Sequence, residues 1–82
     1  MNTRKHFVTL CLYDNTEVTY IKTKNGLEVT FEKAVNKGFC ELVVTIDGEI
    51  IKNEGFNDAE VGRLIRFLKR NKNLIIKGAK VA

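Results

Sequence analysis

Apolar and polar residues alternate along the first two thirds of the chain, a pattern typical of short β-strands. Residues 7–13, Phe-Val-Thr-Leu-Cys-Leu-Tyr, are apolar at both alternate sets of positions, as in a strand buried on both faces. Further strands are predicted at residues 17–24, 27–35, 39–46 and 49–52. Residues with turn chemistry separate these segments, so the pattern predicts an antiparallel meander.

The hairpin signals also predict how the strands pair. Asn25-Gly26 is typical of a two-residue type I′ turn, which places Tyr20 opposite Phe31. A second loop at Lys37-Gly38 then places Val44 opposite Phe31, and Asp47-Gly48 closes a third hairpin. Because side chains alternate between the two faces of a sheet, Tyr20, Phe31 and Val44 are expected to share the core face.

A helix is predicted after the strands, starting near residue 58. Asn57 suits the N-cap position, and Glu60 three residues later completes a capping box. Apolar residues then recur at helical spacing and form a core-facing stripe: Val61, Leu64, Ile65 and Leu68. Gly62 is expected to allow a close approach of this helix to the sheet or to a partner.

The helix is expected to end at residue 70, because Asn71-Lys72-Asn73 is a stop signal. Residues 74–76, Leu-Ile-Ile, then form either a short final strand or a tail that packs on the sheet. The predicted fold is therefore α+β, with an antiparallel β-meander of four to five strands packed by one C-terminal amphipathic helix. Residues 1–82 form a single domain of this kind.

Composition and charge exclude several classes of function. The chain has no serine, so a serine nucleophile is excluded, and one histidine, His6, cannot assemble a catalytic triad. Cys11 and Cys40 are too far apart in sequence for a zinc or redox motif. We therefore expect no enzyme activity, no metal and no cofactor.

The net charge is +4, and residues 57–82 carry seven bases against two acids. Arg63, Arg66 and Arg70 fall on one helical face with Lys69 beside them, although Lys outnumbers Arg in the chain by ten to four. Arginine suits phosphate and carboxylate groups. This face is either a contact surface for an anionic partner or a solvated face that complements the helix dipole.

Acidic residues are predicted on the sheet face away from the core. Glu28, Glu32, Glu41 and Asp47 share this face with threonines and with a few apolar side chains. Two interpretations remain open, an ordinary exposed sheet face and an interaction surface; nothing in the pattern closes a pocket for acid/base catalysis.

The order of elements, meander strands followed by one capped helix, resembles that of transcriptional-coactivator and Whirly-type single-strand DNA binders. The resemblance covers most of the chain and rests on no sequence motif. It implies DNA binding on a basic, aromatic-bearing sheet, whereas Glu28, Glu32 and Glu41 occupy the corresponding face here and repel phosphate.

We therefore expect a small cytoplasmic, non-enzymatic protein-interaction or regulatory module of a bacterium or mobile element, without a membrane span. The alternative is a nucleic-acid-binding protein that uses Arg63, Arg66, Lys69 and Arg70. Because residues 7–13 are apolar on both faces, a homodimer that buries the surplus apolar surface is expected. A tail at 74–76 that folds back over the same surface is the monomeric alternative.

Overall fold

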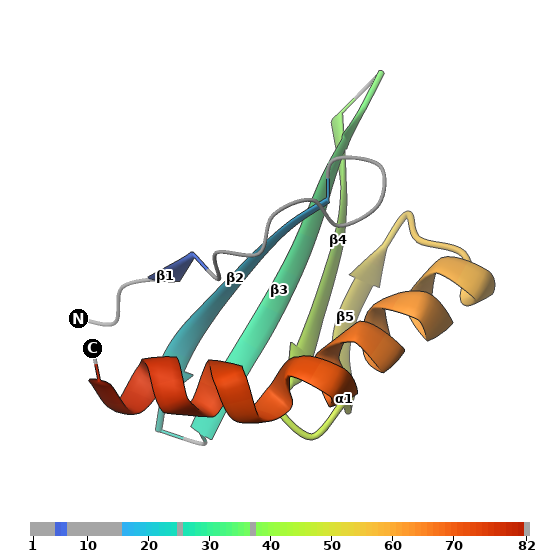
Figure 1. Ribbon diagram of the computed structural model, residues 1–82. Helices are drawn as coiled ribbons and strands as arrows, with labels where there is room; N and C mark the ends of the chain where they lie inside the picture. Colours follow the sequence, from blue (N-terminus) through green and yellow to red (C-terminus); the bar gives the residue numbers. More distant parts are fainter. Residues whose placement is uncertain (1–4, 7–15, 25, 37, 82) are drawn as a thin grey trace.

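The protein forms a five-stranded antiparallel sheet packed by one C-terminal helix (Figure 1). The computed structural model describes residues 5–6, 16–24, 26–36 and 38–81, so the strand predicted at 7–13 lies outside the described residues. The strands lie in the sheet in chain order. The elements are β1 (Lys5–His6), β2 (Thr16–Thr23), β3 (Gly26–Val35), β4 (Gly38–Thr45), β5 (Ile50–Glu54) and α1 (Asp58–Val81). The α+β meander with a C-terminal helix is thus confirmed.

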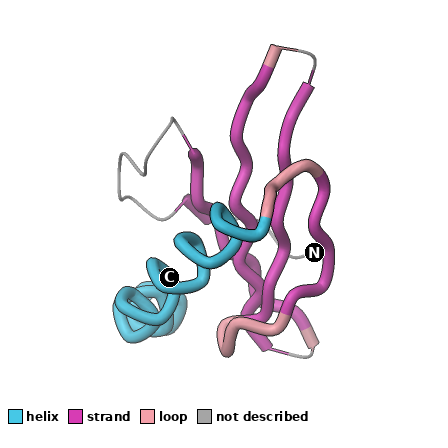
Figure 2. The backbone as a smooth tube through the Cα atoms, turned by 90° about the vertical axis from the view of Figure 1, so that its right-hand side faces the viewer, coloured by secondary structure: helices cyan, strands magenta, loops and turns pink. Residues whose placement is uncertain are grey.

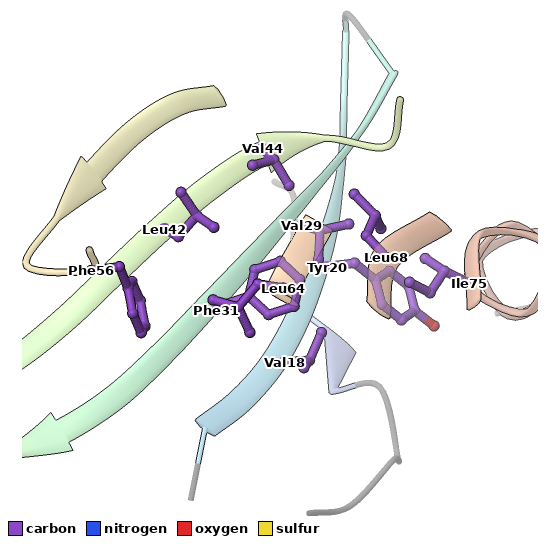
Figure 3. Packing of buried hydrophobic residues seen from close by; sticks show 10 residues of the cluster. All are labelled: Val18, Tyr20, Val29, Phe31, Leu42, Val44, Phe56, Leu64, Leu68 and Ile75. Carbon is purple, nitrogen blue, oxygen red and sulfur yellow. The ribbon is translucent and has the colours of Figure 1, made fainter. Parts of the chain in front are cut away.

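The molecule has two layers, because α1 crosses one face of the sheet and lies entirely on that side (Figure 2). Alternate residues of β2, β3 and β4 point toward α1 and pack against its apolar stripe (Figure 3). We call the opposite sheet face, away from α1, the back face. The buried apolar residues are Val18, Tyr20, Val29, Phe31, Leu42, Val44, Phe56, Leu64, Leu68 and Ile75.

The predicted strand pairing is wrong by two residues in both hairpins. Val18 rather than Tyr20 lies opposite Phe31, because β3 begins at Gly26, whose partner is Thr23. On the other side, Phe31 lies opposite Leu42 rather than Val44. A shift of two residues keeps each side chain on its face, so the predicted core face is correct although the pairs are not.

The last strand is also displaced from its prediction. It spans Ile50–Glu54 instead of 49–52, because the chain makes a wider turn after β4. In that turn the Gly48 amide donates to the Thr45 carbonyl, and the Thr45 amide donates to the Glu49 carbonyl. An irregularity at Val43/Val44 interrupts the pairing of β4 with β5. All five residues of β5 are exposed, as suits a twisted edge strand.

Gly55 joins β5 to the helix and has a φ of +95°, which L side chains rarely adopt. A Cβ atom at this position would lie 2.8 Å from the Cys40 Sγ atom. Just before it, the Asn53 side chain accepts a hydrogen bond from the Phe56 amide and donates one to the Phe56 carbonyl. These contacts turn the chain back toward the sheet and bury Phe56 at the start of α1.

The helix is much longer than predicted. It contains 24 residues, Asp58–Val81, and continues through the expected stop at 71–73. The segment 74–76 is therefore helical, so the predictions of a final strand and of a separate tail are wrong, although the expected packing of this segment on the sheet occurs through Ile75. Ile75 is fully buried and lies seven residues after Leu68, so the apolar stripe simply continues for two more turns. Packing of this face outweighs the weak helix propensity of asparagine.

The close approach of α1 to the sheet that was expected at Gly62 does not occur there, and the alternative, a close approach to a partner, stays a prediction. The nearest atom that a Cβ there would meet is a guanidinium nitrogen of Arg66 at 3.9 Å, an ordinary contact. The close approach instead occurs at Gly78, where a Cβ would lie 3.1 Å from the Tyr20 hydroxyl oxygen. The C-terminal half of α1 therefore approaches β2, and the helix crosses the sheet to reach it (Figure 1).

Candidate binding surface

The start of α1 is fixed by the predicted capping box. The Glu60 amide donates to the Asn57 side chain at 2.8 Å, and the Asn57 amide donates to a Glu60 carboxylate oxygen at 3.1 Å. This backbone hydrogen bond lowers the pKa of Glu60 below its ordinary value of 4.5, and Lys33 adds to the effect. The carboxylate is also well placed beside the positive end of the helix dipole.

Two ion pairs hold α1 on the sheet. Lys33 of β3 contacts Glu60 in the first turn at 3.3 Å, and Lys72 contacts Asp47 in the β4–β5 turn at 2.7 Å. Asp47 therefore faces the helix side of the molecule, and its prediction as a back-face residue is wrong. Together with the buried stripe, these pairs fix which side of α1 is turned outward.

The outer side of α1 carries the predicted basic residues. Arg63, Arg66, Lys69 and Arg70 are all exposed, as expected from their spacing. Because the helix continues, Lys77 extends the same side by two turns beyond Arg70. At 1.5 Å per residue, the distance along the axis from position 63 to position 77 is about 21 Å. We call these exposed cations the basic stripe: Arg63, Arg66, Lys69, Arg70 and Lys77.

Among the described residues, the basic stripe shares its lack of ion pairs with Lys22 and Lys24 at the β2–β3 hairpin, and differs in this from three other lysines. Lys33, Lys52 and Lys72 each contact a carboxylate. Within the described part of the chain, no member of the basic stripe forms an ion pair or a side-chain hydrogen bond. Arg63 does interact electrostatically with the Glu60 carboxylate, whose pKa it helps to lower. The stripe thus presents five cationic groups, none of which is in ion-pair contact with a described carboxylate.

An exposed leucine accompanies these cations and was missed by the sequence analysis. Leu74 is 58% exposed and lies one turn after Arg70 on the same side of α1. The sequence prediction ended the helix at residue 70 and so placed neither Leu74 nor Lys77 on this surface. The available signal was the seven-residue spacing from Leu68 to Ile75, which indicates that the helix continues.

The back face carries a row of glutamates, one from each of four neighbouring strands. Glu17 lies opposite Glu32, Glu32 opposite Glu41, and Glu41 opposite Glu54. We call these four residues the glutamate row. Directly opposed like charges are unfavourable in a sheet. Lys52 relieves part of this repulsion by contacting Glu41 at 2.9 Å and Glu54 at 3.3 Å, and these contacts raise the pKa of Lys52 above its ordinary value.

The centre of the back face differs from the exposed surface that the sequence predicts. Glu28, Glu32 and Glu41 lie there as expected, but each is only half-exposed. Thr19 and Thr30, which lie opposite each other beside the glutamate row, are buried. The Thr19 hydroxyl has no hydrogen-bond partner, an unusual state for a buried polar group.

The remaining candidates for chemistry are not gathered into a site. Cys40 is half-buried against Gly55, and its thiol is outside any disulfide. Cys11 and the side chain of His6 lie outside the described part of the chain. Among the described residues, no three His, Cys, Asp or Glu side chains are placed to hold a metal ion. Over the same residues, α1 falls short of the length of apolar sequence that crossing a membrane requires.

Comparison with models of known protein families, with curated proteins and with solved structures gave no match. The functional argument therefore rests on the two charged surfaces, the basic stripe and the glutamate row.

Proposed function

We propose that this protein is a small non-enzymatic interaction module that binds an acidic protein surface through the outer side of α1. The observation that carries the proposal is the basic stripe, whose five cations are exposed on one side of α1. Among them only Arg63 interacts with a described carboxylate, that of Glu60, and it does so without an ion-pair contact. Such a module regulates by occupying its partner. We also propose a cytoplasmic location, which the free thiol of Cys40 supports.

The positions of the arginines along α1 favour a contact surface for a partner over a solvated face that only complements the helix dipole. A dipole effect acts mainly on charges in the last turn of a helix, whereas Arg63 and Arg66 lie in its first half. Arg66 and Arg70 stand one turn apart, and both can donate paired hydrogen bonds to carboxylates. The buried stripe of α1, with ion pairs in the first turn and near the middle of the helix, holds this surface in place before a partner arrives, which lowers the entropic cost of binding.

Leu74 favours a protein partner over the second candidate, a nucleic acid. An exposed leucine beside arginines adds apolar contact with a protein surface, and the cores of protein interfaces combine such groups. Contacts with a phosphate backbone gain little from leucine, since they depend on counterion release and hydrogen bonds. The arginines suit an acidic protein and a nucleic acid equally well. Leu74 is therefore the reason for placing the protein partner first.

The test compares two variants with the same change in charge. R66Q/R70Q removes the centre of the basic stripe, and K22Q/K24Q removes two exposed cations at the β2–β3 hairpin. The probe is a synthetic helical peptide with glutamates one turn apart and leucines beside them. We expect R66Q/R70Q to weaken binding by about tenfold or more and K22Q/K24Q to change it by less than about threefold. Equal losses in the two variants would contradict the proposal.

A third variant separates the two partner classes. L74A should weaken binding of the acidic peptide severalfold and leave binding of a generic DNA duplex or single strand unchanged. If DNA binds more tightly than the peptide, with a steep dependence on salt that R66Q/R70Q reduces, the nucleic-acid alternative is correct instead.

A further inference from the structure

The two charged surfaces lie on opposite sides of the molecule. The helix α1 lies on one side of the sheet (Figure 2). The basic stripe is on its outer side, and the glutamate row is on the back face of the sheet. They therefore cannot neutralise each other within one molecule. Two copies stacked in the same orientation, however, would bring the basic stripe of one against the glutamate row of the next.

The spacing of charges on the two surfaces is similar. Neighbouring strands lie about 4.8 Å apart, so the glutamate row repeats at about that distance across the sheet. Along α1, the rise from Arg63 to Arg66 is about 4.5 Å and the rise from Arg66 to Arg70 is about 6 Å. A helix laid across the strands thus brings successive arginines close to successive glutamates, in the same crosswise direction in which α1 crosses its own sheet (Figure 1).

Each surface also has an exposed apolar residue beside its charges. Phe39 is 70% exposed and, with its cross-strand partner Ala34, forms the pair next to Glu32 and Glu41 on the back face. On the helix, Leu74 lies one turn after Arg70. When Arg70 is placed near Glu41, Leu74 falls on the side of β4 and β5, within reach of Phe39. Contact between them would cover two of the largest exposed apolar side chains.

The hydroxyl of Thr19 is a buried polar group of the back face that has no partner within the described residues. Thr19 is 7% exposed, lies two residues along β2 from Glu17 on the same face, and its Oγ1 atom has no partner. A guanidinium seated between Glu17 and Glu32 has donors for both carboxylates.

We propose that the acidic partner of α1 is the back face of a second copy of this chain. This inference rests on the proposed function, because it names the partner of the same basic stripe. Pairing two copies through α1 on both sides would oppose cations to cations, so the contact joins unlike surfaces and is not two-fold symmetric. Such a head-to-tail contact leads to a closed ring or to an open chain of copies.

Glu17 and Glu32 are the main acceptors in this contact. Lys52 already contacts Glu41 and Glu54, whereas no described cation contacts the other two. The variant E17Q/E32Q therefore removes the unpaired half of the glutamate row. Its control is E28Q/E49Q, which makes the same change in charge at one back-face position outside the row and at one position in the β4–β5 turn.

Mixing two deficient variants tests the head-to-tail arrangement. R66Q/R70Q keeps its glutamate row, and E17Q/E32Q keeps its basic stripe. By sedimentation equilibrium at low salt, we expect the parent protein and E28Q/E49Q to self-associate and each deficient variant alone to do so at least about tenfold more weakly. An equimolar mixture should form a one-to-one complex, because one intact contact remains between unlike copies.

Three results would overturn the inference: a parent protein that stays at 9.3 kDa at all concentrations, a mixture that fails to associate, or equal losses in E17Q/E32Q and E28Q/E49Q. A parent protein that stays at 9.3 kDa is a monomer, and a mixture that fails to associate indicates a two-fold dimer in place of a head-to-tail contact. None of these results affects the peptide experiment. If R66Q/R70Q still binds the acidic peptide more weakly than the parent protein does, the proposed function stands. Only the second copy is then excluded as the partner of the basic stripe.

Discussion

At the scale of single residues, the fold depends on a few side chains that meet several elements at once. Phe31 is fully buried, lies opposite Val18 and Leu42, and makes an edge-to-face contact with Phe67 of α1 at 6.2 Å between ring centroids. Such aromatic contacts add stability beyond the area that they bury. The ring therefore links three strands and the helix at the centre of the core.

Replacing this ring should be costly. We expect Phe31→Ala to lower the free energy of unfolding by roughly 3–5 kcal/mol, because it removes apolar contacts and leaves a cavity. Chemical denaturation, followed by circular dichroism, measures the change. The conservative control is Val35→Ala, at an exposed position near the end of the same strand. If both variants unfold at the same denaturant concentration as the parent, the described core is wrong.

Glycine substitutions should have opposite signs at two positions. Gly62 lies within α1, where a Cβ meets no close neighbour, so Gly62→Ala should stabilise by about 1 kcal/mol through helix propensity. Gly55→Ala should instead destabilise, because that residue has a φ of +95° and a Cβ would lie 2.8 Å from the Cys40 Sγ atom. Thermal unfolding of both variants under one condition tests the pair. A loss of stability in Gly62→Ala would reinstate a packing role for that glycine.

At the scale of elements, the sequence predicts which face of the sheet each residue occupies. It does not predict the register of the strands or the length of the helix. Alternation has a period of two, so Phe31 was assigned to the correct face although its strand partners were misassigned by two residues. The basic stripe was predicted in part, because Arg63 and Arg70 follow helical spacing. Its extension past Asn71 depends on the burial of Ile75 against the sheet, a long-range contact that local propensity does not reveal.

The first turn of α1 should make folding pH-dependent. The hydrogen bond from the Asn57 amide lowers the pKa of Glu60 below 4.5 in the folded protein. A lowered folded pKa means that the added stability is present above the unfolded pKa and is lost as the pH falls through the folded one. We expect Glu60→Gln to be less stable than the parent at pH 7 and the difference to shrink below about pH 4.

Thermal melts of both proteins across this pH range measure the effect, and Asp58→Asn is the matched control in the same turn. Asp58 is exposed, and no described cation contacts it. A difference between Glu60→Gln and the parent that stays constant from pH 7 to pH 3 would show that the charge of Glu60 does not stabilise the helix start.

At the scale of the whole molecule, the structure separates charge into two layers. The helix layer carries the unpaired arginines, and the back face carries the glutamate row, with only Lys52 among the described residues neutralising part of it. The sheet and the core position these surfaces, because the buried stripe of α1 sets which side of the helix faces outward, and the ion pairs of Lys33 and Lys72 add to this. In the proposed function, α1 binds the acidic protein partner and the sheet supports the helix.

The most direct test of this assignment is to map the amide signals of the protein by NMR while the acidic helical peptide is added. We expect the perturbed backbone amides to include those along α1 between residues 63 and 77, with Leu74 among them. Perturbations confined to the sheet or to the exposed edge at Ile50 and Ile51 would contradict it.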